Sequence, residues 1–285
     1  MKLKGWRAER DSRRAPAAKR GRRTGEEPDR TPPKLKIMNI KAYKTHKILP
    51  NENLFEILDK YLPTLSEKSI VAIASKIVGL CEGRAVKIDQ TNSNQKDELV
   101  KQEAEYYIPR EDKYKFMLTI NHGALVGNAG IDESNANGTY ALWPKDPQKS
   151  ANEIREHLVK KYNLKEIGVI LTDSKLTPLR YGVTGYAITH SGFKALNSYV
   201  DKPDIFGRLM KVEKANIPDA LASASVAVMG EGDEQQPLAV ITEVPFIQFQ
   251  SGNPSQEELD ELKIHLEDDI FSSLLSKVEW KKGRE

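Results

Sequence analysis

Three short acidic segments contain the residues of this sequence that are best suited to chemistry. Carboxylate and hydroxyl oxygens are hard ligands that favour Mg²⁺ or Mn²⁺. If the segments meet in space, they predict a metal site for phosphoryl transfer. Taken singly, each is more typical of a turn or a solvated helix cap. The segments are Gly130–Asn135, which contains Asp132, the pair Asp173-Ser174, and Glu231–Glu234.

Glycines surround the first and third of these segments. Backbone N–H groups in such loops can bind phosphate oxygens. The sequence has no Walker A motif and no G-x-G-x-x-G after a strand, so the common nucleotide-binding folds are not supported. Its five histidines are widely separated, and its one cysteine, Cys81, is expected to be a small buried apolar residue.

Hydrophobic periodicity and turn signals predict the elements that must position these segments. Asp146-Pro147 gives the clearest helix start, a carboxylate N-cap followed by proline at the first helical position. We expect the acidic segments in loops, with the strand 167–171 ending directly at Thr172-Asp173-Ser174. The other expected helices are 53–61, 97–107, 218–229 and 254–280, and the other expected strands are 69–74, 116–120 and 237–244.

Composition indicates a protein of the reducing cytoplasm. The 285 residues have an ordinary share of apolar and charged side chains, and a single cysteine excludes an internal disulfide framework. No apolar run approaches the length of a membrane span, so we expect no membrane partner.

The first residues differ from the rest in charge. Residues 1–36 carry 13 Lys/Arg against 5 Asp/Glu, a local charge of +8, which leaves −5 for the remainder. We expect residues 1–37 to be a disordered basic tail, because they lack apolar periodicity. An arginine-rich arm could bind nucleic acid, but aromatic residues other than Trp6 are missing. A solvated tail, or translation starting at Met38, is the preferred interpretation.

Several motifs in a fixed order resemble the coenzyme F420-0:L-glutamate ligase family, over roughly residues 40–245. The resemblance depends on the order of the motifs more than on any one of them. They are Ser75-Lys76-Ile77-Val78 with Glu82-Gly83-Arg84, Asn128–Asn135, Pro144–Pro147 with Ser150-Ala151, Ile154-Arg155, Thr172-Asp173-Ser174 with Arg180 and Gly182, Asp204 with Gly207-Arg208, and Met229-Gly230-Glu231 with Glu234 and Pro237.

This resemblance implies a γ-glutamyl ligase that uses GTP, with ATP left open, together with Mg²⁺ or Mn²⁺ and with K⁺ as a further ion. L-Glutamate would be joined to a carboxylate acceptor through an acyl phosphate. Carried over by position, the metal ligands are Asp132, Asp173, Ser174 and Glu231. The nucleotide-contacting positions are Ser75, Lys76, Asn135, Gly230, Gly232, Asp233 and Glu234, with Leu49 and Pro50 against the base.

The resemblance also implies a homodimer and an α+β fold with mixed sheets in two intimately joined subdomains. We expect the catalytic domain to span residues 38–250 and a C-terminal helical extension to span residues 251–285. Gly79-Leu80 stands where the family often has Ser-Lys. Two alternatives therefore stay open: a divergent homologue that acts on a folate-like or other carboxylate, and a nucleotide- or deazaflavin-binding protein without ligase activity.

Overall fold

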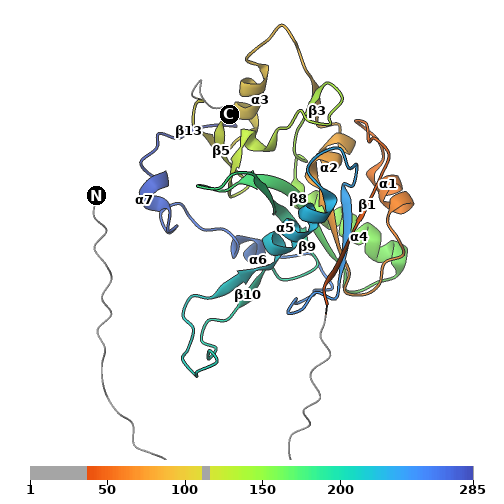
Figure 1. The fold of residues 1–285 in the computed structure, drawn as a ribbon, viewed down its shortest axis with the longest axis vertical. Coiled ribbons are helices and arrows are strands. Elements are labelled where there is room, and N and C mark those ends of the chain that lie inside the picture. Colours follow the sequence, from red (N-terminus) through yellow and green to blue (C-terminus); the bar gives the residue numbers. More distant parts are fainter. Residues whose placement is uncertain (1–36, 111–115, 285) are drawn as a thin grey trace, which may run out of the picture. The chain divides into compact units, whose positions relative to one another are not determined.

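A five-stranded mixed sheet forms the centre of the computed structural model, which describes residues 37–110 and 116–284 (Figure 1). The predicted tail, residues 1–37, lies outside the described residues except for Ile37. β2 and β8 run parallel, and the other neighbouring strands run antiparallel. The strand order is β1 (Asn39–Tyr43), β12 (Leu238–Thr242), β2 (Ile70–Ala74), β8 (Gly168–Leu176) and β9 (Val183–Ser191).

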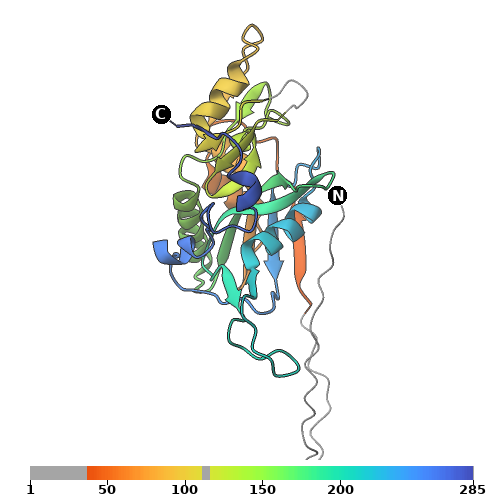
Figure 2. The same ribbon diagram turned by 90° about the vertical axis from the view of Figure 1, so that its left-hand side faces the viewer.

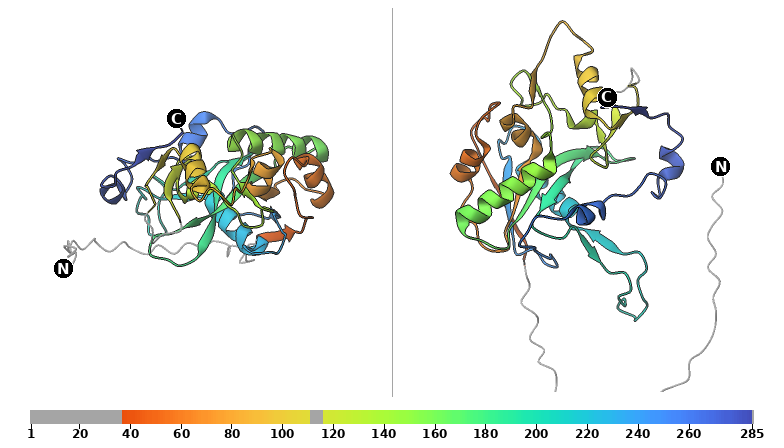
Figure 3. Two further views of the ribbon diagram at one scale, coloured as in Figure 1. Left: turned by 90° about the horizontal axis from the view of Figure 1, so that it is seen from above. Right: turned by 180° about the vertical axis from the view of Figure 1, so that it is seen from behind.

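Helices cover both faces of this sheet (Figure 3). Val71 and Ile73 of β2 pack in one core with α1 (Leu54–Tyr61), α2 (Ser75–Cys81) and α4 (Pro147–Tyr162). Ile70 and Ala72 face the opposite core, which contains α5 (Ile217–Met229). Because the strand is buried on both faces, its sequence is a continuous apolar run.

A smaller, four-stranded sheet packs with helix α3 (Gln95–Glu103) around a separate hydrophobic core. Val100, Met117, Ile131 and Leu142 form its core. A short pair, β3 (Ala85–Lys87) and β7 (Thr139–Ala141), adjoins it, and a 3-10 turn spans Asn128–Gly130. The strand order is β13 (Lys281–Lys282), β4 (Tyr106–Tyr107), β5 (Leu118–Asn121) and β6 (Ala124–Gly127).

A two-stranded arm extends away from the central sheet (Figure 2). It consists of β10 (Leu196–Ser198), β11 (Lys214–Asn216) and the loop 199–213 between them. Ile205 and Phe206 near its tip are almost fully exposed.

Most predicted elements are confirmed, with shifts at their ends. Asn53 and Asp146 cap α1 and α4 through their side chains, as their types indicate. The helix expected over 97–107 ends at Glu103, because the chain then forms β4. The strand expected to end at Leu171 continues through Leu176 beside β9, with a bulge between Leu171 and Thr172. Asp173 and Ser174 therefore lie within a strand rather than in a loop.

The prediction of one long C-terminal helix over 254–280 is wrong. The segment forms two short helices, α6 (Gln256–Asp260) and α7 (Ser272–Leu275), followed by β13. Like charges four residues apart, Glu257 and Glu261, oppose a longer α6. The chain must also become extended to pair β13 with β4.

The fold class is α+β with mixed and antiparallel sheets. Its division into two joined subdomains stays a prediction. In the described part of the chain, no helix is both long and apolar enough to cross a membrane.

Candidate functional site

A cleft of about 920 Å³ opens where the carboxyl ends of β2 and β8 lie side by side. Ala74 and Thr172 are paired in the last register position of these parallel strands. Ser75-Lys76 and Asp173-Ser174 therefore emerge at the same edge of the sheet, the position at which ligands bind in many sheets with parallel strands.

The cleft brings together twelve of the thirteen predicted site residues. Two of them begin α2 and two lie on β8, Leu49 comes from the segment between β1 and α1, and the loops after the 3-10 turn and after α5 supply the others. Pro50 is not among the residues that line the cleft. The residues that do are Leu49, Ser75, Lys76, Asp132, Asn135, Asp173, Ser174, Gly230, Glu231, Gly232, Asp233 and Glu234.

Asp132 is held by an ammonium and a hydroxyl group. Lys76 Nζ lies 2.5 Å from Asp132 Oδ2 and also donates to the carbonyl oxygen of Ser134 at 2.9 Å. The Ser134 hydroxyl donates to Asp132 Oδ2 at 2.6 Å. Burial opposes the charge on Asp132, but Lys76 and Ser134 outweigh it and lower the pKa of this carboxyl. Asp132 is therefore a carboxylate at neutral pH.

Asp173 is more strongly desolvated. The Trp143 indole N–H donates to Asp173 Oδ2 at 2.5 Å, and the Ser174 backbone N–H donates to Oδ1 at 2.8 Å. Burial raises the pKa of Asp173 to about 6 despite these donors and the charge of Lys76. A cation near this carboxylate would be stabilised by a negative charge that water does not fully solvate.

The loop after α5 forms the opposite wall. The Ser174 hydroxyl donates to Glu231 Oε1 at 2.6 Å. The Asn135 side chain donates to the Gly232 carbonyl oxygen at 2.8 Å, and the Gly232 N–H donates to Glu234 at 2.8 Å. The Asn135 bond joins the first and third acidic segments, which are 97 residues apart in the sequence, and the Ser174 bond joins the second and third.

The oxygen donors of Asp132, Asp173, Ser174 and Glu231 fit a hard divalent cation in chemical type and in charge. Within residues 37–110 and 116–284, no three carboxylate, imidazole or thiol groups converge closely enough to form a metal cluster. The Lys76 ammonium lies against Asp132, where it supplies positive charge.

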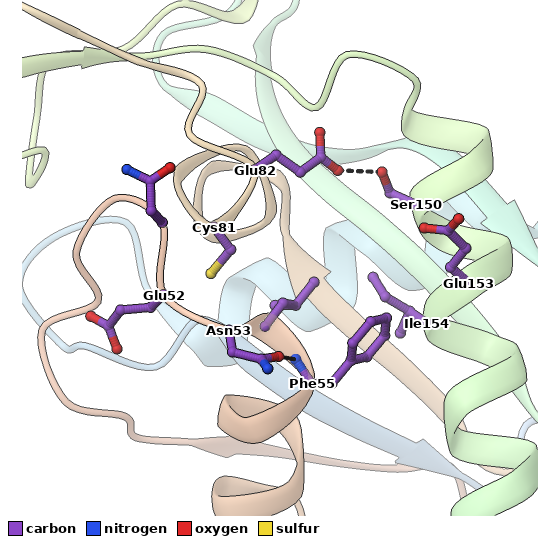
Figure 4. Close-up of a pocket in the computed structure, with 10 residues that line it drawn as sticks. Glu52, Asn53, Phe55, Cys81, Glu82, Ser150, Glu153 and Ile154 are labelled. Carbon is purple, nitrogen blue, oxygen red and sulfur yellow. Dashed lines mark hydrogen bonds between the residues drawn. The ribbon is translucent and has the colours of Figure 1, made fainter.

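A second pocket of about 350 Å³ lies between α1, α2 and α4 (Figure 4). It also contains carboxylates, but Glu82 accepts from the Ser150 hydroxyl at 2.5 Å and from the Lys145 backbone N–H at 3.1 Å. Cys81 is half-buried here rather than fully buried as expected. Burial, together with Glu52 and Glu82, raises the pKa of its thiol to about 12, so it is unsuited to nucleophilic catalysis.

Some residues with contacts at the cleft were not chosen from the sequence, and three of them bear on the site. Ser134 and Lys96 line the cleft, and Trp143 lies behind it against Asp173. Ser134 belongs to the quoted segment Asn128–Asn135, so its motif could have identified it. Trp143 directly precedes Pro144 of another quoted motif, but nothing in its local sequence indicates a contact with residue 173.

Comparisons with known proteins give a consistent answer. The sequence family described as F420-0:Gamma-glutamyl ligase matches residues 42–243. The chain is 35% identical over 231 residues to coenzyme F420:L-glutamate ligase of Methanococcus maripaludis, covering 76% of this chain and 90% of that protein. The enzyme of the same name from Methanocaldococcus jannaschii is 32% identical over 234 residues, covering 77% and 90%. The one from Methanopyrus kandleri is 32% identical over 209 residues, covering 68% and 82%.

Proposed function

The chain belongs to the F420-0:gamma-glutamyl ligase family, and from this we propose that it joins L-glutamate to a carboxylate acceptor of the coenzyme F420-0 type. The reaction would use GTP and Mg²⁺ or Mn²⁺ and would pass through an acyl phosphate. The relatives named above are called coenzyme F420:L-glutamate ligases, which supports both the reaction class and the acceptor.

One observation about the cleft carries the proposal. Asp132, Asp173 and the Ser174–Glu231 pair line the same cavity, which has ample volume for a nucleotide beside a second substrate. Lys76 adds a positive charge at this edge. Oxygen ligands together with a lysine are the groups that bind and neutralise a triphosphate.

Different residues of the cleft would bind the metal ion, the phosphate groups and the nucleotide. Asp132, Asp173, Ser174 and Glu231 do not converge on one point in the described structure, so they would have to close around the divalent ion as it binds. The ion when bound would neutralise phosphate charge as a Lewis acid. Lys76 would exchange its contact with Asp132 for phosphate oxygens. The loop Gly230–Glu234 and Asn135 would fix the nucleotide, since their mutual hydrogen bonds set the wall of the cleft.

The proposed reaction has two steps, formation of an acyl phosphate and formation of the amide. An oxygen of the acceptor carboxylate attacks the γ-phosphorus of GTP, and the bond to the β-phosphate oxygen breaks, which leaves GDP and an acyl phosphate. The neutral amine of glutamate then attacks the acyl carbon, phosphate leaves with its electron pair, and the nitrogen loses a proton. By holding both substrates, the cleft would convert each encounter into an intramolecular reaction.

The alternative of a binding protein without ligase activity depended on Leu80. This side chain is 3% exposed and packs with Ala85, Ala136 and Ala141. Leucine at this position contributes to the core and also lines the cleft, where it brings no charge, and Lys76 supplies the positive charge at this edge instead.

An acceptor panel tests the proposal. Purified protein is mixed with GTP or ATP, Mg²⁺ or Mn²⁺, L-glutamate, and either F420-0 or a folate-like carboxylate, and product mass and phosphate release are followed. We expect an amide of F420-0 that requires both nucleotide and metal. Asp132→Asn should lose at least about a hundred-fold in turnover, while Glu153→Gln on the exposed side of α4 should retain it. Nucleotide binding without amide formation on any acceptor would favour the binding protein.

A further inference from the structure

Trp143 connects the two carboxylates that approach the cleft from different parts of the fold. It follows β7 and precedes α4, and its side chain is 4% exposed. A tryptophan buried to this extent normally has a partner for its N–H group. Here the partner is a carboxylate of the proposed metal site.

The first contact is polar. The indole N–H donates to Asp173 Oδ2 at 2.5 Å, and the second carboxylate oxygen, Oδ1, accepts from the Ser174 backbone N–H. Both oxygens are therefore fixed by one donor each, which sets the plane of the carboxylate. The remaining lone pair of each oxygen is free of these two bonds.

The second contact is steric. The backbone of Gly130 lies directly against the indole, so that a Cβ atom at this position would overlap Cε2, Nε1 and Cδ2 of the ring. Gly130 also has a φ of +81°, which favours glycine. Asp132 follows two residues later, so the face of the indole determines where the Asp132 loop leaves the 3-10 turn.

Trp143 is itself held from behind. Its carbonyl oxygen accepts from Arg84 Nε at 3.1 Å, and the Arg84 guanidinium is paired with Glu103 at 2.5 Å. The rings of His122 and Tyr186 lie 5.9 Å and 6.4 Å from the indole, centroid to centroid. With its edge, face and backbone all engaged, the side chain has little freedom to change rotamer.

We propose that Trp143 is a positioning residue that fixes Asp173 and the Asp132 loop relative to each other, so that both carboxylates can bind one divalent cation. This inference rests on the proposed function, since it presumes a metal at that site. Groups that hydrogen-bond to a ligand orient it, and losing one commonly costs about ten- to a hundred-fold in metal affinity.

The test is Mn²⁺ binding, measured by electron paramagnetic resonance in the presence of GDP and without turnover. Wild type should bind Mn²⁺, and Trp143→Phe should bind it about ten- to a hundred-fold more weakly because the N–H donor is lost. Trp280→Phe is the matched control and should match wild type. The Trp280 indole donates to the Leu275 carbonyl oxygen in the C-terminal extension. Thermal unfolding of each variant shows whether it is folded.

A second measurement does not require a mutation at position 143. The sequence has three tryptophans, so the double variant Trp6→Phe, Trp280→Phe leaves Trp143 as the sole tryptophan, and excitation beyond the absorption band of tyrosine selects its emission. We expect Mn²⁺, which is paramagnetic, to quench this emission and to saturate at the concentration that saturates the resonance signal.

The outcomes separate the two proposals. Equal Mn²⁺ affinity for folded Trp143→Phe and wild type overturns the positioning role while leaving the metal site intact. Emission from Trp143 that is unaffected while Mn²⁺ binds overturns it as well. If wild type binds no Mn²⁺ with or without nucleotide, the metal-dependent function itself fails, and the positioning role fails with it.

Discussion

The β8–β9 ladder contains two desolvated ionisable residues, one in each half, and the two differ in their surroundings. Asp173 on β8 lies opposite Tyr186 and receives hydrogen bonds from Trp143 and Ser174. His190 on β9 lies opposite Ile170 and is 1% exposed. Neither of its ring nitrogens has a hydrogen-bond partner among the described residues. Both groups belong to the same two strands, yet only Asp173 adjoins the cleft.

Burial shifts the pKa of both groups toward their neutral forms. It raises the pKa of Asp173 to about 6 and lowers the pKa of His190 to about 4. A perturbed pKa alone therefore does not distinguish a candidate site from a packed core. Directed donors, a second charged group and open volume make that distinction, and only the Asp173 half of the ladder has all three.

The largest expected effect tests this distinction directly. Asp173→Asn should lower turnover by about a thousand-fold or more, because a bound metal contributes several kcal/mol to phosphoryl transfer. His190→Leu, in the other half of the ladder, should change turnover by less than about three-fold. Initial rates of amide formation at saturating substrates measure both. Comparable losses in the two variants would mean that the ladder acts as a whole and that the contrast between its halves is wrong.

Packing around Asp173 is the next test. Gly130→Ala should destabilise the protein by about 4 kcal/mol, since overpacking against Trp143 adds to the strain of a positive φ. Gly138→Ala is the matched control, because Gly138 also has a positive φ but no atom lies within 4 Å of an added Cβ. It should cost about 1 kcal/mol. Urea unfolding measures the stability of both variants. Equal losses of unfolding free energy would show that the Trp143 indole does not restrict the backbone at Gly130.

Local signals were sufficient to predict much of the fold. The predicted cap Asp146 depends on a side chain that bonds to its own helix, so its type reveals the boundary, and Asn53, expected as the first residue of a helix, caps α1 in the same way. The extension of β8 through Asp173 depends on pairing with β9, which lies further along the chain and is invisible to local periodicity. The prediction of a single helix over residues 254–280 was wrong for the same reason, because the last strand, β13, forms only by pairing with β4.

The candidate site shows a similar limit. Resemblance in motif order identified Lys76, Asp132 and Asp173, and the structure brings all three to one cleft. The pairing of Lys76 with Asp132 joins residues 56 apart in sequence, and the bond from Trp143 to Asp173 joins residues 30 apart. Such contacts follow from the tertiary fold, so residue types and spacing could not reveal them.

The third test concerns the effect of acid on stability through His190 of the β8–β9 ladder. An unfolded histidine has a pKa near 6.5, whereas burial holds the pKa of His190 at about 4, against the opposing effects of the Phe193 backbone and of the charge of Glu258. Between these values the unfolded chain binds the proton and the folded chain does not, so acid favours unfolding. Relative to His190→Leu, wild type should lose stability as pH falls from about 6.5 to 4, reaching about 3 kcal/mol.

Urea unfolding of both proteins across this pH range isolates the contribution of one side chain. At pH 7.5, His190→Leu should be as stable as wild type or more stable, because neither ring nitrogen makes a well-formed hydrogen bond and only the Phe193 backbone lies close to the imidazole. A difference in stability that does not change with pH would show that His190 is solvated or partnered in solution.

The smallest expected effect tests whether a hydrogen-bonded carboxylate is enough to make a site. Glu82 has two donors, as Asp173 does, but it lines the smaller pocket, where the nearby thiol of Cys81 is protonated and unreactive. Glu82→Gln should cost about 1 kcal/mol in urea unfolding, since the amide can replace part of these bonds. Its turnover should stay within about two-fold of wild type. A loss of turnover approaching that of Asp173→Asn would show that the smaller pocket at the C-terminal end of α2 also takes part in the reaction. Hydrogen-bonded carboxylates would then contribute to activity in both pockets.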